Sequence, residues 1–170
     1  MSDTTIAGAL SRLEKLEAER DIVHTLYAYS HHLDLGQDEK WADCFTEDGV
    51  IDIHYLPEKL PVARVAEGTR HAKGIRHKGR RQLLAFVAGH DHPPAHVFKH
   101  LMIEPRITVD GDTGTGTAYL VRVDDVGGVP RITSFGRYVD RYRRVGPGEW
   151  RIEERVVELE GAFPGPRGNA

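Results

Sequence analysis

The sequence predicts one α+β domain: a cone-shaped α+β barrel in which a strongly bent antiparallel sheet wraps around an N-terminal helix. Apolar residues recur at roughly helical spacing over residues 6–34, an alternating pattern typical of strands fills residues 96–160, and glycine-containing turns divide that stretch. Helices followed by a run of antiparallel strands indicate the α+β class. The open end of such a cone is a natural place for a small-molecule pocket.

The first helix is expected from about Ile6 to Asp34, because apolar side chains occur there at helical spacing among Glu, Lys and Arg. Gly36 follows the last apolar position, where a C-terminal cap is expected. The apolar positions are Leu10, Leu13, Leu16, Ile22, Val23, Leu26, Tyr27 and Leu33.

A short second helix is expected over residues 38–45, and the period then changes to that of a strand at residues 50–53. Residues 56–78 contain two prolines and two glycines among many basic side chains, and we interpret them as a long loop or hairpin that could close over a pocket mouth. Another helix is expected over residues 80–88. The inward-facing side chains of the second helix are predicted to be Trp41, Cys44 and Phe45.

Four strands complete the prediction, and tight turns rich in glycine join them. We expect a single domain over residues 1–162 and a flexible tail, rich in proline and glycine, over residues 163–170. The strands are expected at residues 96–109, 113–124, 132–145 and 150–160.

Length and composition exclude several classes of protein. A chain of 170 residues suits one domain, and 39% hydrophobic with 29% charged residues is typical of a globular protein. The net charge of −3, without a dominant basic stripe, argues against nucleic acid as a partner. No apolar run approaches a membrane span or a signal segment. Because Cys44 is the single cysteine, no internal disulfide can form, and a cytoplasmic location is the simplest expectation.

Three segments together resemble the SnoaL-like, nuclear-transport-factor-2-like family. Residues 29–34 carry its helix motif of Tyr, four residues and Asp. Residues 41–52 resemble its Trp-containing helix followed by Phe, two residues, Asp and a strand, and residues 100–112 resemble its His-bearing strand and acidic turn. The resemblance covers roughly residues 15–160 and implies the bent-sheet cone.

The resemblance also implies acid–base chemistry without a cofactor, because dehydratases such as scytalone dehydratase and the bile-acid 7α-dehydratase belong to this family. Tyr29, Asp34 and His100 match the working group of the bile-acid enzyme residue by residue. The basic residue on that enzyme's final strand has no clear counterpart, since Leu159 falls near it. A homodimer or homotrimer is expected by the same resemblance.

Asp34 and His100 could form an acid–base pair. A carboxylate bonded to one imidazole nitrogen fixes the tautomer and directs the other nitrogen toward a substrate. We therefore expect Asp34 to orient His100, His100 to remove a proton next to a carbonyl, and Tyr29 to polarise or protonate an oxygen. In the structural alternative, Asp34 belongs to the helix end, His100 to the sheet and Tyr29 to the core.

Four further residues are expected to bind the substrate, and Arg122 among them could hold an anion if its strand position faces inward. A local basic cluster in and after the long loop is either solvated or attracts an anionic substrate. The other three substrate-binding residues are expected to be Phe98, Tyr119 and Asp124. The basic cluster consists of Arg64, Arg70, His71, Lys73, Arg76, His77, Lys78, Arg80 and Arg81.

A metal site is the alternative use of the histidines, because His90, His92, His96 and His100 lie close together in the sequence and imidazole trios can hold zinc. Residues 93–94 are both proline and interrupt this run, so we expect His90 and His92 to lie in a solvated loop. The prediction is therefore that no metal and no cofactor are bound.

The predicted function is that of a cofactor-independent lyase or isomerase, with dehydratase-type chemistry, that acts on a small hydrophobic molecule containing a carbonyl group. One alternative is a polyketide cyclase or hydrolase that uses the same Asp/His pair. Another is a non-catalytic module for small-molecule binding or assembly, which would have an exposed apolar sheet surface and no buried Asp–His contact.

Overall fold

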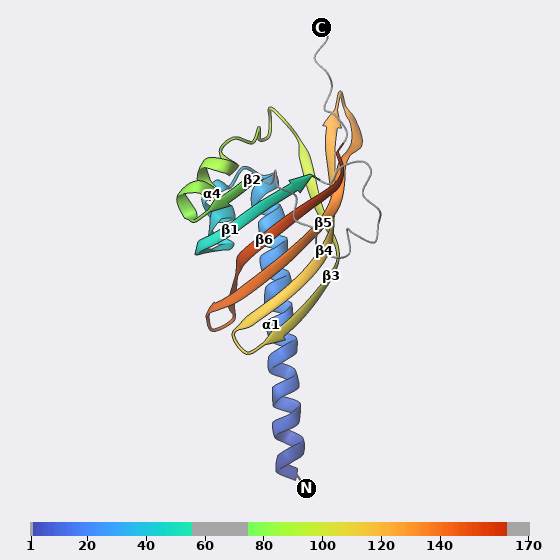
Figure 1. The fold of residues 1–170 in the computed structure, drawn as a ribbon. Helices are drawn as coiled ribbons and strands as arrows, with labels where there is room; N and C mark the ends of the chain where they lie inside the picture. The colour runs from blue at the N-terminus through green and yellow to red at the C-terminus, as the bar shows by residue number, and fades with distance from the viewer. Residues whose placement is uncertain (1, 56–74, 163–170) are drawn as a thin grey trace.

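A computed structural model describes residues 2–55 and 75–162 of the chain. Figure 1 shows helix α1 lying against one face of a bent sheet, while helix α4 lies beside strands β1 and β2. In chain order the elements are α1 (Ser2–Asp34), α2 (Asp38–Asp43), β1 (Phe45–Tyr55), β2 (Ile75–Lys78), α4 (Arg80–Val87), β3 (Phe98–Asp110), β4 (Thr113–Val126), β5 (Val129–Gly146) and β6 (Glu149–Ala162).

The six strands form one sheet in the order β2-β1-β6-β5-β4-β3, and this sheet is bent but not closed. The expected α+β cone is therefore confirmed. Neighbouring strands are antiparallel except β1 and β6, which run parallel. Because β1 and β6 are far apart in the chain, no hairpin constrains their direction. Register shifts within the long pairs, such as that between Ile103 and Arg106, help the sheet to bend.

Helix α1 has two rows, or stripes, of apolar side chains, and only one of these stripes packs on the sheet. The core-facing residues are spaced three or four apart, as expected for one side of a helix. Leu10, Leu13 and Leu16, which the sequence grouped with that stripe, are exposed, because the N-terminal half of α1 projects beyond the sheet in Figure 1. Neither α1 nor any other described helix is long and apolar enough to cross a membrane. The buried residues are Ala18, Ile22, Leu26, Tyr29 and Leu33.

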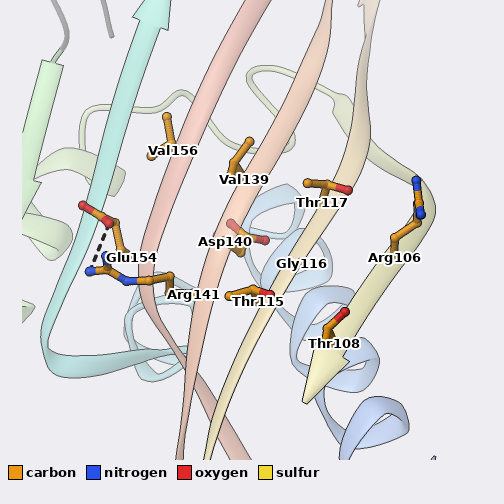
Figure 2. A pocket seen from close by; sticks show the side chains of 10 residues that line it. All are labelled: Arg106, Thr108, Thr115, Gly116, Thr117, Val139, Asp140, Arg141, Glu154 and Val156. Atoms are coloured by element: carbon orange, nitrogen blue, oxygen red, sulfur yellow. Dashed lines mark ion pairs between the residues drawn. The ribbon is translucent and has the colours of Figure 1, made fainter. Parts of the chain in front are cut away.

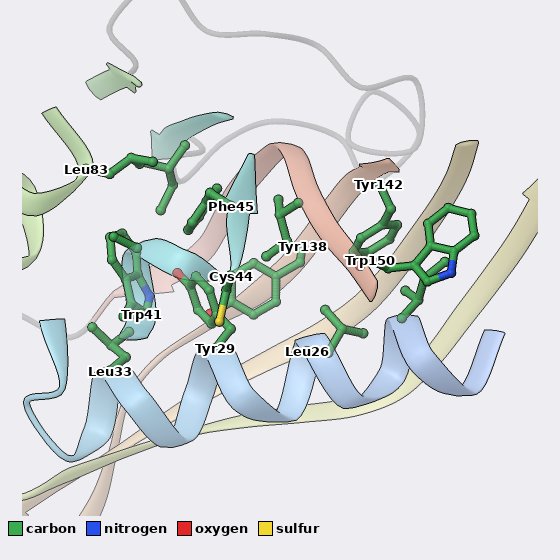
Figure 3. Close-up of a cluster of buried hydrophobic side chains, with 14 of the residues drawn as sticks. Leu26, Tyr29, Leu33, Trp41, Cys44, Phe45, Leu83, Tyr138, Tyr142 and Trp150 are labelled. Carbon is green, nitrogen blue, oxygen red and sulfur yellow. The ribbon is translucent and has the colours of Figure 1, made fainter. Parts of the chain in front are cut away.

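The core lies between α1, the short helix α2 and the concave face of the sheet (Figure 3). Trp41, Cys44 and Phe45 are buried there, which confirms the inward side of the second helix. Burial raises the pKa of the Cys44 thiol to about 12, so this cysteine stays protonated and behaves as a small apolar residue.

Element boundaries differ from the prediction mainly around β1. This strand begins at Phe45 rather than Val50, because Phe45 already pairs with Ile152 of β6. Gly36 has φ +65°, which fits the predicted helix cap. The expected long loop of residues 56–78 falls mostly outside the described residues, but its end forms β2, which pairs with β1.

The outer face of the sheet, opposite α1, carries exposed apolar side chains. Leu101, Ile103, Tyr119 and Phe135 are each between 41% and 59% exposed. Ile103 lies opposite Tyr119 in the β3–β4 register, and Phe135 lies opposite Val121 in the β4–β5 register, so these residues are neighbours. This is the apolar sheet surface expected of a binding or assembly module.

Candidate active site

Asp34, the last residue of α1, lies against His100 of β3. Its Oδ1 is 2.8 Å from His100 Nδ1, and its two oxygens accept the backbone N–H of His100 at 3.1 and 3.0 Å. Asp34 is buried and the His100 side chain is 10% exposed. A carboxylate that accepts these N–H groups assigns the proton to Nδ1, which leaves Nε2 of His100 with a free lone pair.

His100 lines a partly open cavity of about 190 Å³ between α1, α4 and the concave side of the sheet. Its polar groups lie close together, because His100, Arg122 and Ser134 are directly opposite one another on β3, β4 and β5. The rest of the lining is Tyr29, Leu33, Ile51, Ile53, Ile75, Phe86, His90, Leu120, Tyr138, Val157 and Leu159. The cavity is thus an apolar chamber with one polar row.

Asp34 is not part of the cavity lining and lies behind His100. Tyr29 and Asp34 are five residues apart, so a regular helix turns their side chains about 140° from each other. The structure accommodates this angle because only Tyr29 has to reach the cavity, whereas Asp34 reaches the imidazole from the helix end. Tyr29, Asp34 and His100 therefore lie together as one group. Tyr29 and His100 can touch a ligand in the cavity, whereas Asp34 contacts His100 from behind.

Tyr29 is buried among the rings of Trp41, Phe45 and Tyr138, with centroids 5.5 to 6.1 Å away. Burial raises the pKa of its hydroxyl, although the neighbouring Arg155 and Trp41 act in the opposite direction. The hydroxyl therefore stays protonated at neutral pH and can donate a hydrogen bond.

Arg155 on β6 is a charged residue in the core that the sequence analysis missed. It is completely buried, and its guanidinium lies 4.0 Å from the Tyr29 ring centroid and 4.1 Å from that of Tyr138. Asp140 of β5 binds it through two bonds of 2.9 and 2.8 Å and also accepts the Tyr142 hydroxyl at 2.6 Å. Asp140 holds the pKa of Arg155 above its ordinary value, although burial opposes the charge.

A signal for this pair exists in the sequence. Asp140 alternates with Tyr138 and Tyr142 on β5, so a period-two pattern places it on the buried face. A carboxylate at such a position requires a cation opposite it, since an unpaired buried charge is costly. Arg155 lies directly opposite in the β5–β6 register.

Arg122 faces the cavity as predicted and is held rigidly from behind. Its Nε and Nη2 donate to Asp124 at 2.7 to 3.2 Å, and its guanidinium lies 4.6 Å from the Phe98 ring centroid. Asp124 also contacts His96 at 2.6 Å and accepts the Thr133 hydroxyl. Among residues 2–55 and 75–162 the Nη1 group of Arg122 has no hydrogen-bond partner, and it is the group that could bind a ligand.

Two of the predicted substrate-binding residues support Arg122 without lining the cavity, namely Phe98 beneath it and Asp124 beside it. The prediction for Tyr119 was wrong. Tyr119 is 59% exposed on the outer face of the sheet, because residues at odd positions of this part of β4 point away from α1 while Ala118 and Leu120 point inward.

His90 lines the cavity, in contrast to the solvated loop that we expected. Its Nδ1 is 3.3 Å from the backbone oxygen of Phe86, and a proton on Nδ1 leaves Nε2 as an acceptor. Burial lowers the pKa of His90, so the ring is neutral at pH 7. The cavity thus contains two imidazoles, those of His90 and His100.

Within residues 2–55 and 75–162, no group of three or more His, Cys, Asp or Glu side chains is placed to hold a metal ion. Two histidines of the candidate metal run lie against separate carboxylates, since His92 is 3.3 Å from Asp38 and His96 is 2.6 Å from Asp124. Two arginines of the described part of the basic cluster are paired with carboxylates, because Arg76 contacts Asp52 at 2.8 Å and Arg80 contacts Asp43 at 2.6 Å.

A second, larger hollow of about 440 Å³ lies on the sheet (Figure 2). Its carboxylates are already paired, Glu154 with Arg141 at 3.1 Å and Asp140 with Arg155 at 2.8 Å. No histidine belongs to its lining, which consists of Arg106, Thr108, Thr115, Gly116, Thr117, Val139, Asp140, Arg141, Glu154 and Val156. The smaller cavity at His100 is therefore the better candidate for acid–base chemistry.

The family model of the SnoaL-like domain matches residues 14–156, which is most of the chain. The chain belongs to the SnoaL-like family. The segment of this SnoaL-like domain that the family model matches contains the residues discussed above, namely Tyr29, Asp34, His100, Arg122 and Arg155. No curated protein matches the sequence significantly.

Solved structures share the fold. An NTF2-like protein with a cystatin-like fold from Novosphingobium aromaticivorans is 24% identical, covers 100% of this chain and 94% of its own, and superposes with a TM-score of 0.72. A variant of Rv3472 from Mycobacterium tuberculosis, a protein of unknown function, is 24% identical over 84% of this chain and 72% of its own, with a TM-score of 0.67. ActVI-ORFA from Streptomyces coelicolor is 19% identical over 84% and 96%, with a TM-score of 0.62. At these identities the likeness concerns the fold of the SnoaL-like domain alone.

Asp124 makes the stability of this SnoaL-like domain sensitive to acid. Burial raises the pKa of Asp124, but hydrogen bonds from Arg122, Thr133 and His96 outweigh it and lower the pKa to about 2. A carboxyl group whose pKa falls on folding, from about 3.9, stabilises the protein above the unfolded value and loses this contribution as pH falls toward the folded value.

We therefore expect the wild-type free energy of unfolding to lose on the order of 2 kcal/mol from Asp124 between about pH 5 and pH 2. The Asp124→Asn variant should be less stable at pH 7 and should lose less on acidification. Urea unfolding at a series of pH values measures both. Parallel curves for the two proteins over this range would contradict the prediction.

Proposed function

We propose that this SnoaL-like domain is a cofactor-independent lyase or isomerase that moves a proton on a small, neutral carbonyl compound bound in the His100 cavity. The observation that carries the proposal is the 2.8 Å contact between Asp34 and His100 at the wall of a mostly apolar cavity. An imidazole held in one tautomer, with Nε2 available to a ligand in this cavity, has the properties of a general base.

The reaction would begin when Nε2 of His100 takes a proton from the carbon next to the substrate carbonyl. The electron pair of that C–H bond forms a C=C bond while the π pair of the carbonyl moves onto its oxygen, and Arg122 Nη1 and Ser134 would donate hydrogen bonds to the resulting oxyanion. The imidazolium, stabilised by Asp34, can return the proton to another carbon and so isomerise a double bond. Where a β-hydroxyl is present, the imidazolium would instead give its proton to that hydroxyl, which departs as water while the enolate re-forms the carbonyl, and Tyr29 would donate a hydrogen bond to the departing oxygen.

Charge and size favour a compact, neutral substrate. Arg122 is neutralised by Asp124 and Arg155 by Asp140, so neither ion pair gives the cavity a net positive charge. The nearby Asp34 carboxylate adds a negative charge that would repel an anionic ligand. A volume of about 190 Å³ is below the range of about 300–1,000 Å³ found for drug-sized ligands. A single-ring ketone or a short enone fits these limits.

Exchange of carbon-bound hydrogen for deuterium tests the proposal on simple carbonyl compounds, so the natural substrate need not be identified first. Monocyclic ketones, cyclic enones and β-hydroxy ketones are incubated with the protein in D₂O and followed by NMR. We expect at least one compound to exchange or lose water faster than in buffer, and His100→Gln to reduce this rate by about 10²–10⁴-fold. A compound that binds but exchanges equally with both proteins would argue against catalysis by His100.

Two alternatives remain distinguishable in the same experiment. A cyclase or hydrolase that uses the same Asp/His pair would leave these ketones unchanged but act on an ester or on a longer polyketide chain. A non-catalytic assembly module is favoured by the exposed sheet patch around Tyr119 and Phe135. It would give no turnover with any compound, and substitution of His100 would change ligand affinity alone.

A further inference from the structure

Helix α1 has a second apolar stripe that the sheet does not cover. Because the helix turns about 100° per residue, this stripe points roughly opposite to the buried stripe that runs from Ala18 to Leu33. An isolated helical segment of this length is only marginally stable in water, so the projecting half of α1 in Figure 1 would gain from a partner. The stripe consists of Ile6, Leu10, Leu13 and Leu16, which are between 50% and 63% exposed.

Three residues of the stripe, Ile6, Leu13 and Leu16, occupy a and d positions of a heptad repeat that continues toward the body of the domain, and Leu10 occupies the adjacent position e. With Ile6 at position a, the a and d positions alternate at spacings of three and four over three heptads, and Arg20 is the single charged residue among them. Apolar residues at this spacing form the seam of a coiled coil. Tyr27, the last of these positions, is 50% exposed. The a and d residues are Ile6, Ala9, Leu13, Leu16, Arg20, Val23 and Tyr27.

The charges beside the seam suit a second copy of the same helix in parallel orientation. In a parallel pair, position g of one helix faces position e five residues further along the other. Arg12 then faces Glu17 of the second copy, and Arg20 lies beside the facing Glu19. None of these four side chains has an ion pair in the described part of its own chain. Parallel pairing would therefore give partners to charges that the single chain leaves solvated.

We infer that α1 pairs in parallel with α1 of a second copy, through the side of the helix opposite the sheet. Each stripe residue exposes on the order of 100 Å², so four residues from each copy would bury on the order of 800 Å². A stable interface needs about 1,200 Å² or more, and extension of the seam to Tyr27 supplies the remainder. In this arrangement the two sheets lie on the outer sides of the helix pair.

Disulfide trapping tests the pairing and its direction. Leu13→Cys is made in a Cys44→Ala background, so that the new thiol is the only one in the chain. At position a of a parallel pair it faces its own copy and should form a disulfide-linked dimer under mild oxidation. The matched control Lys15→Cys lies on the far side of the same helix and should react at least about tenfold more slowly, because thiols held together have a much higher effective concentration.

Light scattering after size exclusion tests the same surface without a cross-link. We expect the wild-type mass to be twice that of the monomer, Leu13→Glu to halve it, and Lys15→Glu to leave it unchanged, with the far-UV circular dichroism of all three nearly the same. A wild-type monomer at all concentrations, equal cross-linking at positions 13 and 15, or a dimer that survives Leu13→Glu would each overturn the inference. In the last case the exposed sheet patch around Tyr119 would be the interface.

Discussion

Replacing Arg155 by Met should lower the free energy of unfolding by about 3–5 kcal/mol, the largest effect that we expect from any single substitution in this protein. Arg155 is fully buried and binds Asp140 through two hydrogen bonds. Methionine fills a similar volume but leaves the Asp140 carboxylate buried, and in the described part of the chain only the Tyr142 hydroxyl then remains to stabilise it. The measurement is urea unfolding at pH 7, followed by circular dichroism.

A second variant separates loss of charge pairing from loss of packing. In Arg155→Met/Asp140→Asn no uncompensated charge remains, so stability should recover by about 2 kcal/mol or more relative to the single variant. Arg141→Met is the matched surface control, since Arg141 is largely exposed next to Asp140 and its ion pair with Glu154 should contribute less than about 1 kcal/mol. If the Arg155 and Arg141 variants are equally stable, the buried pair does not hold the core as we infer.

Replacing Asp34 by Asn should reduce the proton-exchange activity by about 10²–10⁴-fold while the domain stays folded. Asp34 accepts two N–H groups of His100, the backbone N–H with both oxygens and the Nδ1–H with one, whereas Asn offers one acceptor oxygen and one NH₂ donor. The amide would either face the backbone N–H of His100 or force the imidazole into the other tautomer. We expect a cost of about 1–3 kcal/mol in stability from the lost bonds.

The tautomer of His100 is a readout independent of turnover. In ¹⁵N NMR spectra of the wild type at pH 8, Nδ1 should carry the proton and Nε2 should be unprotonated, and Asp34→Asn should change this distribution. Asp38→Asn is the matched control, because Asp38 also contacts a histidine, His92, at 3.3 Å, but neither residue lines the cavity. Equal activity of the Asp34 and Asp38 variants would remove Asp34 from the proposed mechanism.

The acid–base residues could be proposed from the sequence because the family motif places Tyr29 and Asp34 on one helix end and His100 on a strand. The motif could not show which of these residues line the cavity and which lie behind them. Asp34 lies behind His100 and Tyr29 lies at the cavity wall, because the side chain of the last helical residue reaches across to the backbone of β3. Helical spacing alone placed the two residues at an angle that looked unfavourable for a shared site.

His90 and Arg155 illustrate why other parts of the site escaped prediction. A run of histidines and prolines after α4 is typical of a solvated loop, yet the loop turns His90 onto Phe86 and into the cavity. Arg155 belongs to a charged stretch of β6 that resembles an exposed edge, and only its register with Asp140 shows that it faces inward. The composition of a segment does not show which of its residues will lie opposite which residues of a neighbouring strand.

The sequence by itself determined the helices, the four long strands, their turns and the α+β class, because periodicity and turn chemistry act over a few residues. The tertiary structure decided which of the two apolar stripes of α1 meets the sheet, that β1 runs parallel to β6, and that Arg122 faces the cavity while Tyr119 faces outward. These choices depend on pairing between segments that are distant in the chain. Their energies come from burial and from charge pairs that exist only once those segments have met.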